Sequence, residues 1–459
     1  MRRGTKTGAT AGIGAGARLR GGVLLVAAVA VAAGASPRHR SAGDEAEARE
    51  ARELFEKVWT PGEPSPIRGD GIGPLYNATS CVACHHLGGS GGAGGPEGDV
   101  NLLTALPGPP QAVPKHALFR GELEEFHPGF RRRTTIVVHN HATDPGDQKR
   151  LTEINSTVAV QTREELIGLA RSRRSTPSLF GAGLIDAIPD AALRAAEART
   201  FPQFPEIKGR AGRLPGGRLG RFGWKGQTAS LREFVLAACS NELGLEVAGH
   251  HQVSLASLKD FDPSRLNLDL SDEECDRLVG FVANLPRPPY RPAATAFQPL
   301  RGRMIFEAIG CATCHAPRMG RVNGLYSDLL LHDLGDRIRD AATGSYGGPS
   351  RPGGVVDLAA GKDKAAPRPA GEPAPTEWRT PPLWGIASSA PYLHDGRAPG
   401  LDDAIRLHGG EADATSRRYA GLAVVDRQDL LAFLRSLVAP RLPRAPTDFT
   451  LARSRGRRK

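Results

Sequence analysis

Apolar residues recur at helical spacing in three stretches of the chain, whereas alternation at strand spacing is scarce. The helical stretches are 45–59, 190–199 and 231–243, and this periodicity is typical of helices that bury one face. The clearest strand signal is 134–139, which could form half of a hairpin. The pattern predicts a mainly α fold with long loops and a small β element in the first half.

Glycine- and proline-rich segments separate these elements. Residues 88–98 and 344–375 are rich in both and indicate loops. The segment 286–292 (PRPPYRP) indicates a stiff linker. Because 459 residues exceed the usual size of a single core, we expect the chain to divide at this linker.

The N-terminus has the pattern of an export signal. An apolar run at 21–35 follows a basic leader and ends in Ala33-Gly34-Ala35, which fits signal-peptidase cleavage. We therefore expect a signal peptide at 1–35 and a periplasmic protein. The alternative is an uncleaved membrane anchor, although the run is shorter than the ~20 residues that span a bilayer.

The net charge of +11 is concentrated at the two ends of the chain. Residues 1–40 carry seven basic and no acidic residues, and the tail 441–459 carries seven basic and one acidic, so the ends contribute +13 and the rest −2. A near-neutral body argues against a nucleic-acid partner.

Two copies of C-x-x-C-H are the strongest chemical signal. They are Cys81, Cys84 and His85, and Cys311, Cys314 and His315. This spacing is typical of covalently attached haem c, in which the two thiols bind the porphyrin and the histidine binds its iron. The alternatives are local disulfides or a zinc site shared between the copies. The remaining Cys239 and Cys275 could pair or could simply be buried.

Four landmarks occur in the same order in both halves of the chain. They are C-x-x-C-H at 81 and 311, T-P-x-L-aromatic-G at 176 and 380, G-x4-L-x3-[VI] at 226 and 396, and an amphipathic helix at 276–286 and 429–440. The repetition predicts two cytochrome c-like haem domains related by internal duplication, at 45–286 and 293–440. Two porphyrins would also fill a core for which the chain supplies only 5% aromatic residues.

With these residues placed, the chain resembles the di-haem oxidoreductase (thiol oxidoreductase-like) family of the bacterial di-haem cytochrome c peroxidase superfamily. The resemblance covers roughly residues 50–440 and is carried by the segments 71–81, 221–225, 326–333, 379–385, 391–396 and 408–411. It implies peroxide chemistry at the N-terminal haem and electron transfer through the C-terminal haem. It further implies that calcium could be bound, and it leaves the substrate undefined.

The axial ligands decide which haem reacts. His85 and His315 are ligands by the motif itself, and the few methionines are poorly placed to be ligands. In related proteins the sixth ligand lies fourteen residues beyond the histidine of P-Y-x-H-[DN]-G, and that count from His394 reaches His408. The resemblance therefore implies a His315/His408 pair at the second haem, with Tyr326 and His332 as reserve candidates.

The equivalent position in the first half is Ala238, which lies twelve residues after Gly226 as His408 lies twelve after Gly396. Alanine cannot bind iron, so we expect an open first haem. Histidines from the inserted segments could still reach it, and the candidates are His116, His139, His141, His250 and His251.

The resemblance also implies a catalytic glutamate in the helix after Trp224, and Glu242 is the candidate. A carboxylate near the iron could take a proton from peroxide and return it to the leaving oxygen. The alternative is an exposed carboxylate at a helix end. His394 and Arg397 are expected to shape the surroundings of the second haem, and Trp378 and Trp384 to lie near the path between the haems.

These observations favour a periplasmic di-haem oxidoreductase that is peroxidase-like. Its partners would be a periplasmic electron donor or acceptor and a small-molecule oxidant such as peroxide. A membrane would be a partner only if the N-terminal segment is not cleaved. The alternative from another class is a non-catalytic di-haem electron-transfer protein.

Overall fold

The structure is a computed structural model that describes residues 42–62, 69–105, 123–131, 135–161, 166–252, 267–289, 297–340 and 371–440. The expected signal peptide at 1–35, the basic tail at 441–459, His116 and most of the loop at 344–375 lie outside these ranges.

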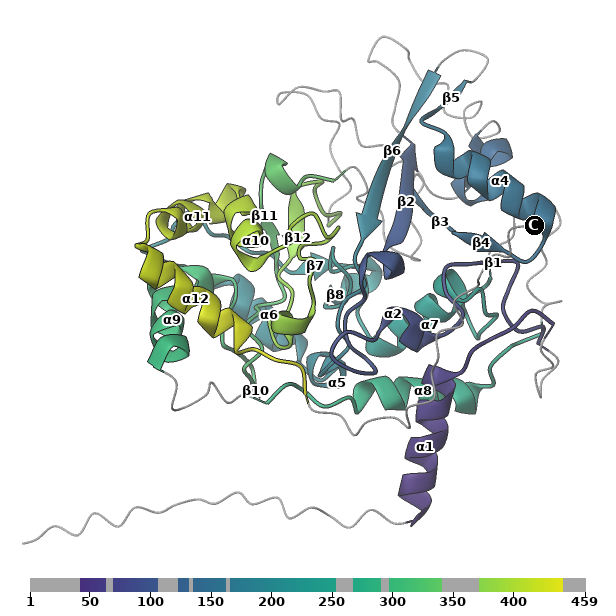
Figure 1. The fold of residues 1–459 in the computed structure, drawn as a ribbon, viewed down its shortest axis with the longest axis horizontal. Coiled ribbons are helices and arrows are strands. Elements are labelled where there is room, and N and C mark those ends of the chain that lie inside the picture. The colour runs from purple at the N-terminus through teal and green to yellow at the C-terminus, as the bar shows by residue number, and fades with distance from the viewer. Residues whose placement is uncertain are drawn as a thin grey trace, which may run out of the picture.

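Helices dominate the described residues, as the periodicity predicts (Figure 1). All three predicted helical stretches are confirmed. Ser271 and Glu274 form a capping box at the start of α8. The helices are α1 Ala42–Glu56, α2 Cys81–Cys84, α4 Pro145–Ser156, α5 Ala182–Asp186, α6 Asp190–Glu197, α7 Leu231–Glu242, α8 Asp272–Ala283, α9 Phe297–Ala308, α10 Leu401–Leu407, α11 Asp413–Ala420 and α12 Val424–Arg435. Short 3₁₀ turns include η5 Cys311–Thr313, η6 Asp336–Ile338 and η8 Gly410–Ala412.

A four-stranded antiparallel sheet in the first half is larger than the predicted β element. Its strand order is β3-β2-β6-β5, and the predicted strand is its edge strand β3. The strands of this sheet are β2 Val100–Ala105, β3 Thr135–Val138, β5 Ala159–Gln161 and β6 Leu166–Arg174. The remaining strands are β1 Leu75–Tyr76, β4 His141–Ala142, β7 Gly212–Arg213, β8 Leu219–Gly220, β9 Arg318–Met319, β10 Val322–Asn323, β11 Leu331–Asp333 and β12 Glu377–Arg379. Sequence periodicity misses the nine-residue β6, and it also misses the twelve-residue helices α4 and α9.

The largest apolar core joins the two halves of the chain. It contains α7 and α8 from the first half together with Leu325, Leu330 and Trp384 from the second. Cys239 and Cys275 are buried in it as free thiols. A smaller core lies between the sheet and α4, and another lies where α9 packs on α12.

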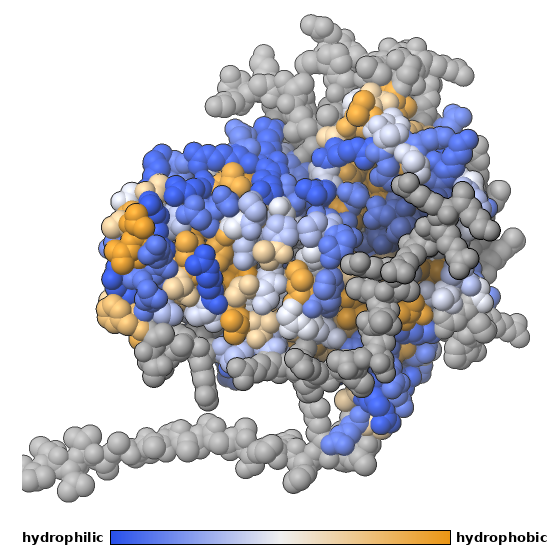
Figure 2. Space-filling view, in the orientation of Figure 1, coloured by the Kyte–Doolittle hydropathy of each residue, from blue (hydrophilic) through white to orange (hydrophobic). Residues whose placement is uncertain are grey.

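The visible face of the molecule is largely hydrophilic, with apolar side chains gathered at the end formed by α9, α11 and α12 (left in Figure 2). Exposed apolar residues there include Phe297 and Met304 on α9 and Val424 on α12. Among the described residues, no helix combines the length and apolarity that a bilayer span requires.

Candidate functional site

The first C-x-x-C-H motif forms the short helix α2. The helix begins after Ser80, whose hydroxyl accepts a hydrogen bond from the Ala83 N–H. Cys81, Cys84 and His85 line one cavity of about 110 Å³, which we call the first cavity. The His85 Nδ1–H donates to the Gly92 carbonyl at 3.1 Å, which leaves Nε2 as the nitrogen that can bind a metal.

The second motif forms the 3₁₀ turn η5. Cys311, Cys314 and His315 line a cavity of about 270 Å³, the second cavity. The His315 Nδ1–H donates to the Tyr326 carbonyl at 3.0 Å, so this imidazole is also fixed with Nε2 as the metal-binding nitrogen. The same local arrangement therefore occurs twice.

Burial sets the protonation of these groups. It raises the pKa of the Cys81, Cys84 and Cys311 thiols to about 12. It also lowers the pKa of His85 and His315 to about 4. Both histidines are therefore neutral near pH 7, and the neutral imidazole is the form that binds a metal.

His408 lies opposite His315 in the second cavity. The two ring centres are 6.5 Å apart, and their planes are inclined at 60°. Two imidazoles that bind one metal from opposite sides have ring centres roughly 6.4 Å apart, given metal–nitrogen bonds of ~2.0–2.1 Å. The His408 Nδ1–H donates to the Ala404 carbonyl at 2.7 Å, so its Nε2 is again the metal-binding nitrogen.

The reserve candidates occupy other places. The Tyr326 carbonyl accepts from His315, so its segment lies on the His315 side. His332 lines the second cavity, but both of its ring nitrogens contact carboxylates, those of Asp328 and Glu411. Met304 is 66% exposed on α9 and lines neither cavity.

Opposite His85 the first cavity has no second histidine among the described residues that line it. Ala238 lines this cavity from α7, which begins five residues after Gly226, just as α10 begins five residues after Gly396. His139 is buried elsewhere and donates to the Asn241 carbonyl, while His251 pairs with Glu246. His141 and His250 do not line the cavity either.

Glu242, the last residue of α7, lines the first cavity and is half-buried. Its Oε2 accepts a hydrogen bond from Asn77 Nδ2 at 2.8 Å. The Asn77 Oδ1 in turn accepts from the Asn140 N–H at 2.9 Å, so the orientation of the amide is fixed. The place of the carboxylate on this helix was predictable from the sequence, whereas the contact with Asn77, 165 residues away, was not.

Trp224 forms part of the wall that separates the two cavities. It lines both, together with the segment 175–177, and its indole N–H donates to the Ser175 carbonyl at 2.9 Å. Trp378 and Trp384, the two tryptophans expected near this path, line the second cavity only. The segment 221–225, which carries part of the resemblance, contains Trp224, but nothing in its local sequence indicates contact with both cavities.

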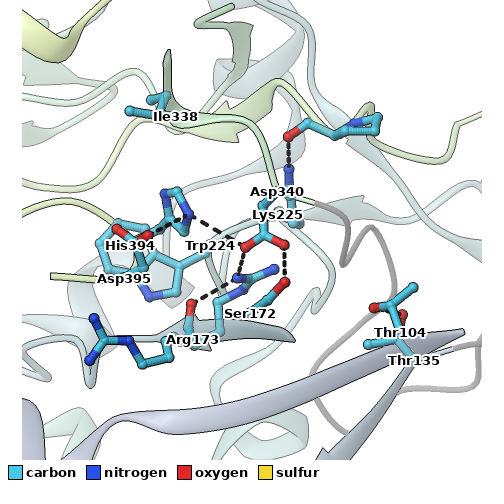
Figure 3. A network of polar contacts seen from close by, with 12 residues as sticks. Thr104, Thr135, Ser172, Arg173, Trp224, Lys225, Ile338, Asp340, His394 and Asp395 are labelled. Atoms are coloured by element: carbon cyan, nitrogen blue, oxygen red, sulfur yellow. Dashed lines mark hydrogen bonds and ion pairs between the residues drawn. The ribbon is translucent and has the colours of Figure 1, made fainter. Parts of the chain in front are cut away.

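A buried polar network joins the halves beside this wall (Figure 3). The Asp340 carboxylate accepts hydrogen bonds from Ser172 and Arg174 on β6 and lies 3.4 Å from His394 Nε2. The His394 ring stacks on the Trp378 indole with ring centres 3.6 Å apart. Lys225 Nζ lies 3.5 Å from the ring centre of the same indole. His394 lines the second cavity as expected.

Arg397 does not line the second cavity, contrary to its expected role around the haem. Its guanidinium pairs with the neighbouring Asp395 and donates to the Arg337 carbonyl. The positive charge of Arg397 is thus paired locally, because Asp395 lies only two residues away in the same turn.

The donor sets of both cavities fit haem. Each offers two thiols and one neutral, oriented imidazole in a mostly apolar enclosure, and the second adds His408. The cysteines of the two motifs line different cavities, which does not favour a zinc site shared between them. Within the described ranges, no group of three or more His, Cys, Asp or Glu side chains is arranged to hold a metal ion.

Comparison with solved structures finds proteins that are similar in part. A structure of hydrazine synthase from Kuenenia stuttgartiensis is 24% identical, with a TM-score of 0.33 over 58% of this chain and 73% of that one. The diheme peroxidase BthA from Burkholderia thailandensis is 15% identical, with a TM-score of 0.36 over 86% of each chain. A MauG-like protein associated with microbial copper homeostasis is 18% identical, with a TM-score of 0.27 over 55% of this chain and 90% of that one.

Sequence comparison gives a stronger result. The gamma subunit of hydrazine synthase from Kuenenia stuttgartiensis is 32% identical over 148 residues, which are 30% of this chain and 40% of that subunit. The chain therefore matches less than half of this relative's length. The profile of the family described as "Di-haem oxidoreductase, putative peroxidase" matches residues 136–347 and 355–437, more than half of the chain. The chain belongs to this di-haem oxidoreductase family.

Proposed function

We propose that the protein is a periplasmic di-haem c-type oxidoreductase that is peroxidase-like, with reaction at the first cavity and electron transfer through the second. The difference between the cavities carries the proposal. His408 faces His315 across the second cavity, whereas Ala238 and Glu242 line the first. One site is thus built to hold six-coordinate iron, and the other to leave a position open beside a carboxylate.

The covalent attachment and the duplication belong to the same proposal. Each cysteine pair would hold one haem c, within units at 45–286 and 293–440. The equal spacing from Gly226 to α7 and from Gly396 to α10 supports a duplicated origin for the two sites. Calcium binding remains an expectation from the resemblance.

The side chains of the first cavity would move one proton between the two oxygens of peroxide, while the two protons that its reduction consumes come from bulk water. A haem bound there supplies redox-active iron with an open position. Reduction of one hydrogen peroxide to two waters consumes two electrons and two protons. Glu242, oriented by Asn77, would accept a proton from the attacking oxygen of peroxide and donate it to the leaving oxygen. The electrons would come from a periplasmic donor through the second cavity, and the aromatic side chains of Trp224 and Phe234 line both cavities.

Ligand binding to the purified holoprotein tests this asymmetry. Cyanide or peroxide is expected to change the optical and EPR signals of one haem, because only the first should have an open coordination position. The second haem should keep its low-spin signal. Two low-spin haems that no small ligand perturbs would instead support the non-catalytic electron carrier.

Substitution of His408 by alanine tests the ligand assignment. The variant should retain two haems while the second changes from low spin to high spin and becomes able to bind cyanide, because its sixth ligand is gone. EPR and optical spectra measure the change. His250→Ala, which replaces a histidine outside both cavities, is the matched control. An unchanged spectrum in His408→Ala would contradict the assignment.

A further inference from the structure

The segment that follows His408 is packed tightly against the end of β11. A Cβ atom added at Gly410 would lie 2.2 Å from the Asp333 carbonyl oxygen, and one at Gly409 would lie 3.0 Å from the Leu334 oxygen. Gly410 also has a φ of +54°, a backbone conformation that residues other than glycine rarely adopt. The two glycines therefore allow a backbone contact that holds this segment close to β11.

Glu411 reaches back from the same segment and joins three parts of the chain. Its Oε2 accepts from the Lys208 N–H at 2.8 Å and contacts His332 Nδ1 at 2.7 Å, and its Oε1 accepts from the Asp333 N–H at 3.2 Å. The carboxylate is only 16% exposed. These contacts involve a charged acceptor, so they are stronger than hydrogen bonds between neutral groups. The partial burial of the carboxylate strengthens them further.

His332 continues the connection to the other side of the second cavity. Its Nε2 lies 3.0 Å from Asp328 Oδ2, and the Asp328 N–H donates to the Cys314 carbonyl, next to His315. Since both ring nitrogens face carboxylates, the imidazole must carry both protons to satisfy them.

We infer that Asp328, His332 and Glu411 form a cluster that fixes His408 at ligand distance from His315, and that Glu411 is its principal positioning residue. The cluster connects the backbone at Cys314, next to His315, to the segment that follows His408. The connection runs through three side chains, a carboxylate, an imidazolium and a second carboxylate. This inference rests on the proposed His315/His408 pair. In this segment His408 would be the ligand, Gly409 and Gly410 allow the close backbone contact with β11, and Glu411 anchors the segment.

The test uses the full holoprotein and the spin state of the second haem. Glu411→Ala should raise the high-spin fraction of that haem, and its occupancy by a fixed low concentration of cyanide, by about tenfold or more, because a lost charge-assisted bond shifts a two-state equilibrium by such a factor. Haem content and the spectrum of the first haem should not change. Glu411→Gln can keep one acceptor oxygen for the Lys208 N–H and His332 Nδ1–H but loses the charge and the Asp333 contact, so its high-spin fraction should lie between those of the parent protein and Glu411→Ala.

Two further variants make the result decisive. Gly410→Ala should give the same spectral change by pushing the segment away from β11. Glu307→Ala, which removes a 46% exposed carboxylate paired within α9, should have no effect. A fully low-spin second haem in both Glu411→Ala and Gly410→Ala would overturn the inference, and if His408→Ala still opened the haem, the proposed function would stand. No change in His408→Ala would instead refute the ligand pair and this inference with it.

Discussion

Replacing Glu242 by glutamine is expected to lower peroxide turnover by ~10²–10⁴-fold, the usual contribution of a general acid–base group. Glutamine has nearly the same shape and can still contact Asn77, but it cannot accept and return a proton. Haem content and cyanide binding at the first haem should therefore be preserved. Steady-state turnover with a reduced electron donor, together with ligand titration of the ferric protein, measures the two effects separately.

The same helix offers a control for this variant. Glu233 lies on α7 and pairs with Arg218 at the surface, so Glu233→Gln should leave turnover unchanged. Turnover in Glu242→Gln equal to the parent protein would remove the acid–base role from Glu242. The open first haem would survive that result, because ligand binding tests it independently.

Double substitution of Cys81 and Cys84 by alanine is expected to remove one of two covalent haems completely. The first cavity would then lack both attachment thiols, and His85 alone does not bind the porphyrin covalently. Mass spectrometry of the denatured protein should show a single haem adduct, and peroxide turnover should be abolished because the reacting iron is gone.

Cys239 and Cys275 provide the matched control for this experiment. Both are buried free thiols outside the two motifs, so Cys239→Ala/Cys275→Ala should keep two haem adducts. Two adducts in Cys81→Ala/Cys84→Ala would contradict covalent attachment at the first motif.

Features encoded within one short segment were predictable from the sequence. The count that selected His408 runs through a turn and the helix α10, so residue spacing there translates directly into position. The same spacing in the first half placed Ala238 in the first cavity. The count to His408 came from the resemblance to related proteins, and the repeat between the two halves then transferred it to Ala238.

Features that depend on distant segments were not predictable. The sequence of β6 contains three arginines, which hide its strand pattern. In the structure Arg174 pairs with Asp340 and Arg171 donates to the carbonyls of Ile154 and Thr157, so polar groups from elsewhere accommodate them. Likewise, Asn77 reaches Glu242 across 165 residues of sequence. No periodicity or motif encodes such a contact.

The apolar core shared by the two halves has a consequence for electron transfer. Trp384 and Leu330 complete a core that is built mainly from first-half helices, so either half alone would expose a broad apolar surface. The two proposed haem sites then share one apolar core instead of lying on two bodies connected by a tether. Electron tunnelling between them would take place over a constant distance. Its rate would not be limited by the diffusion of two separate domains toward each other.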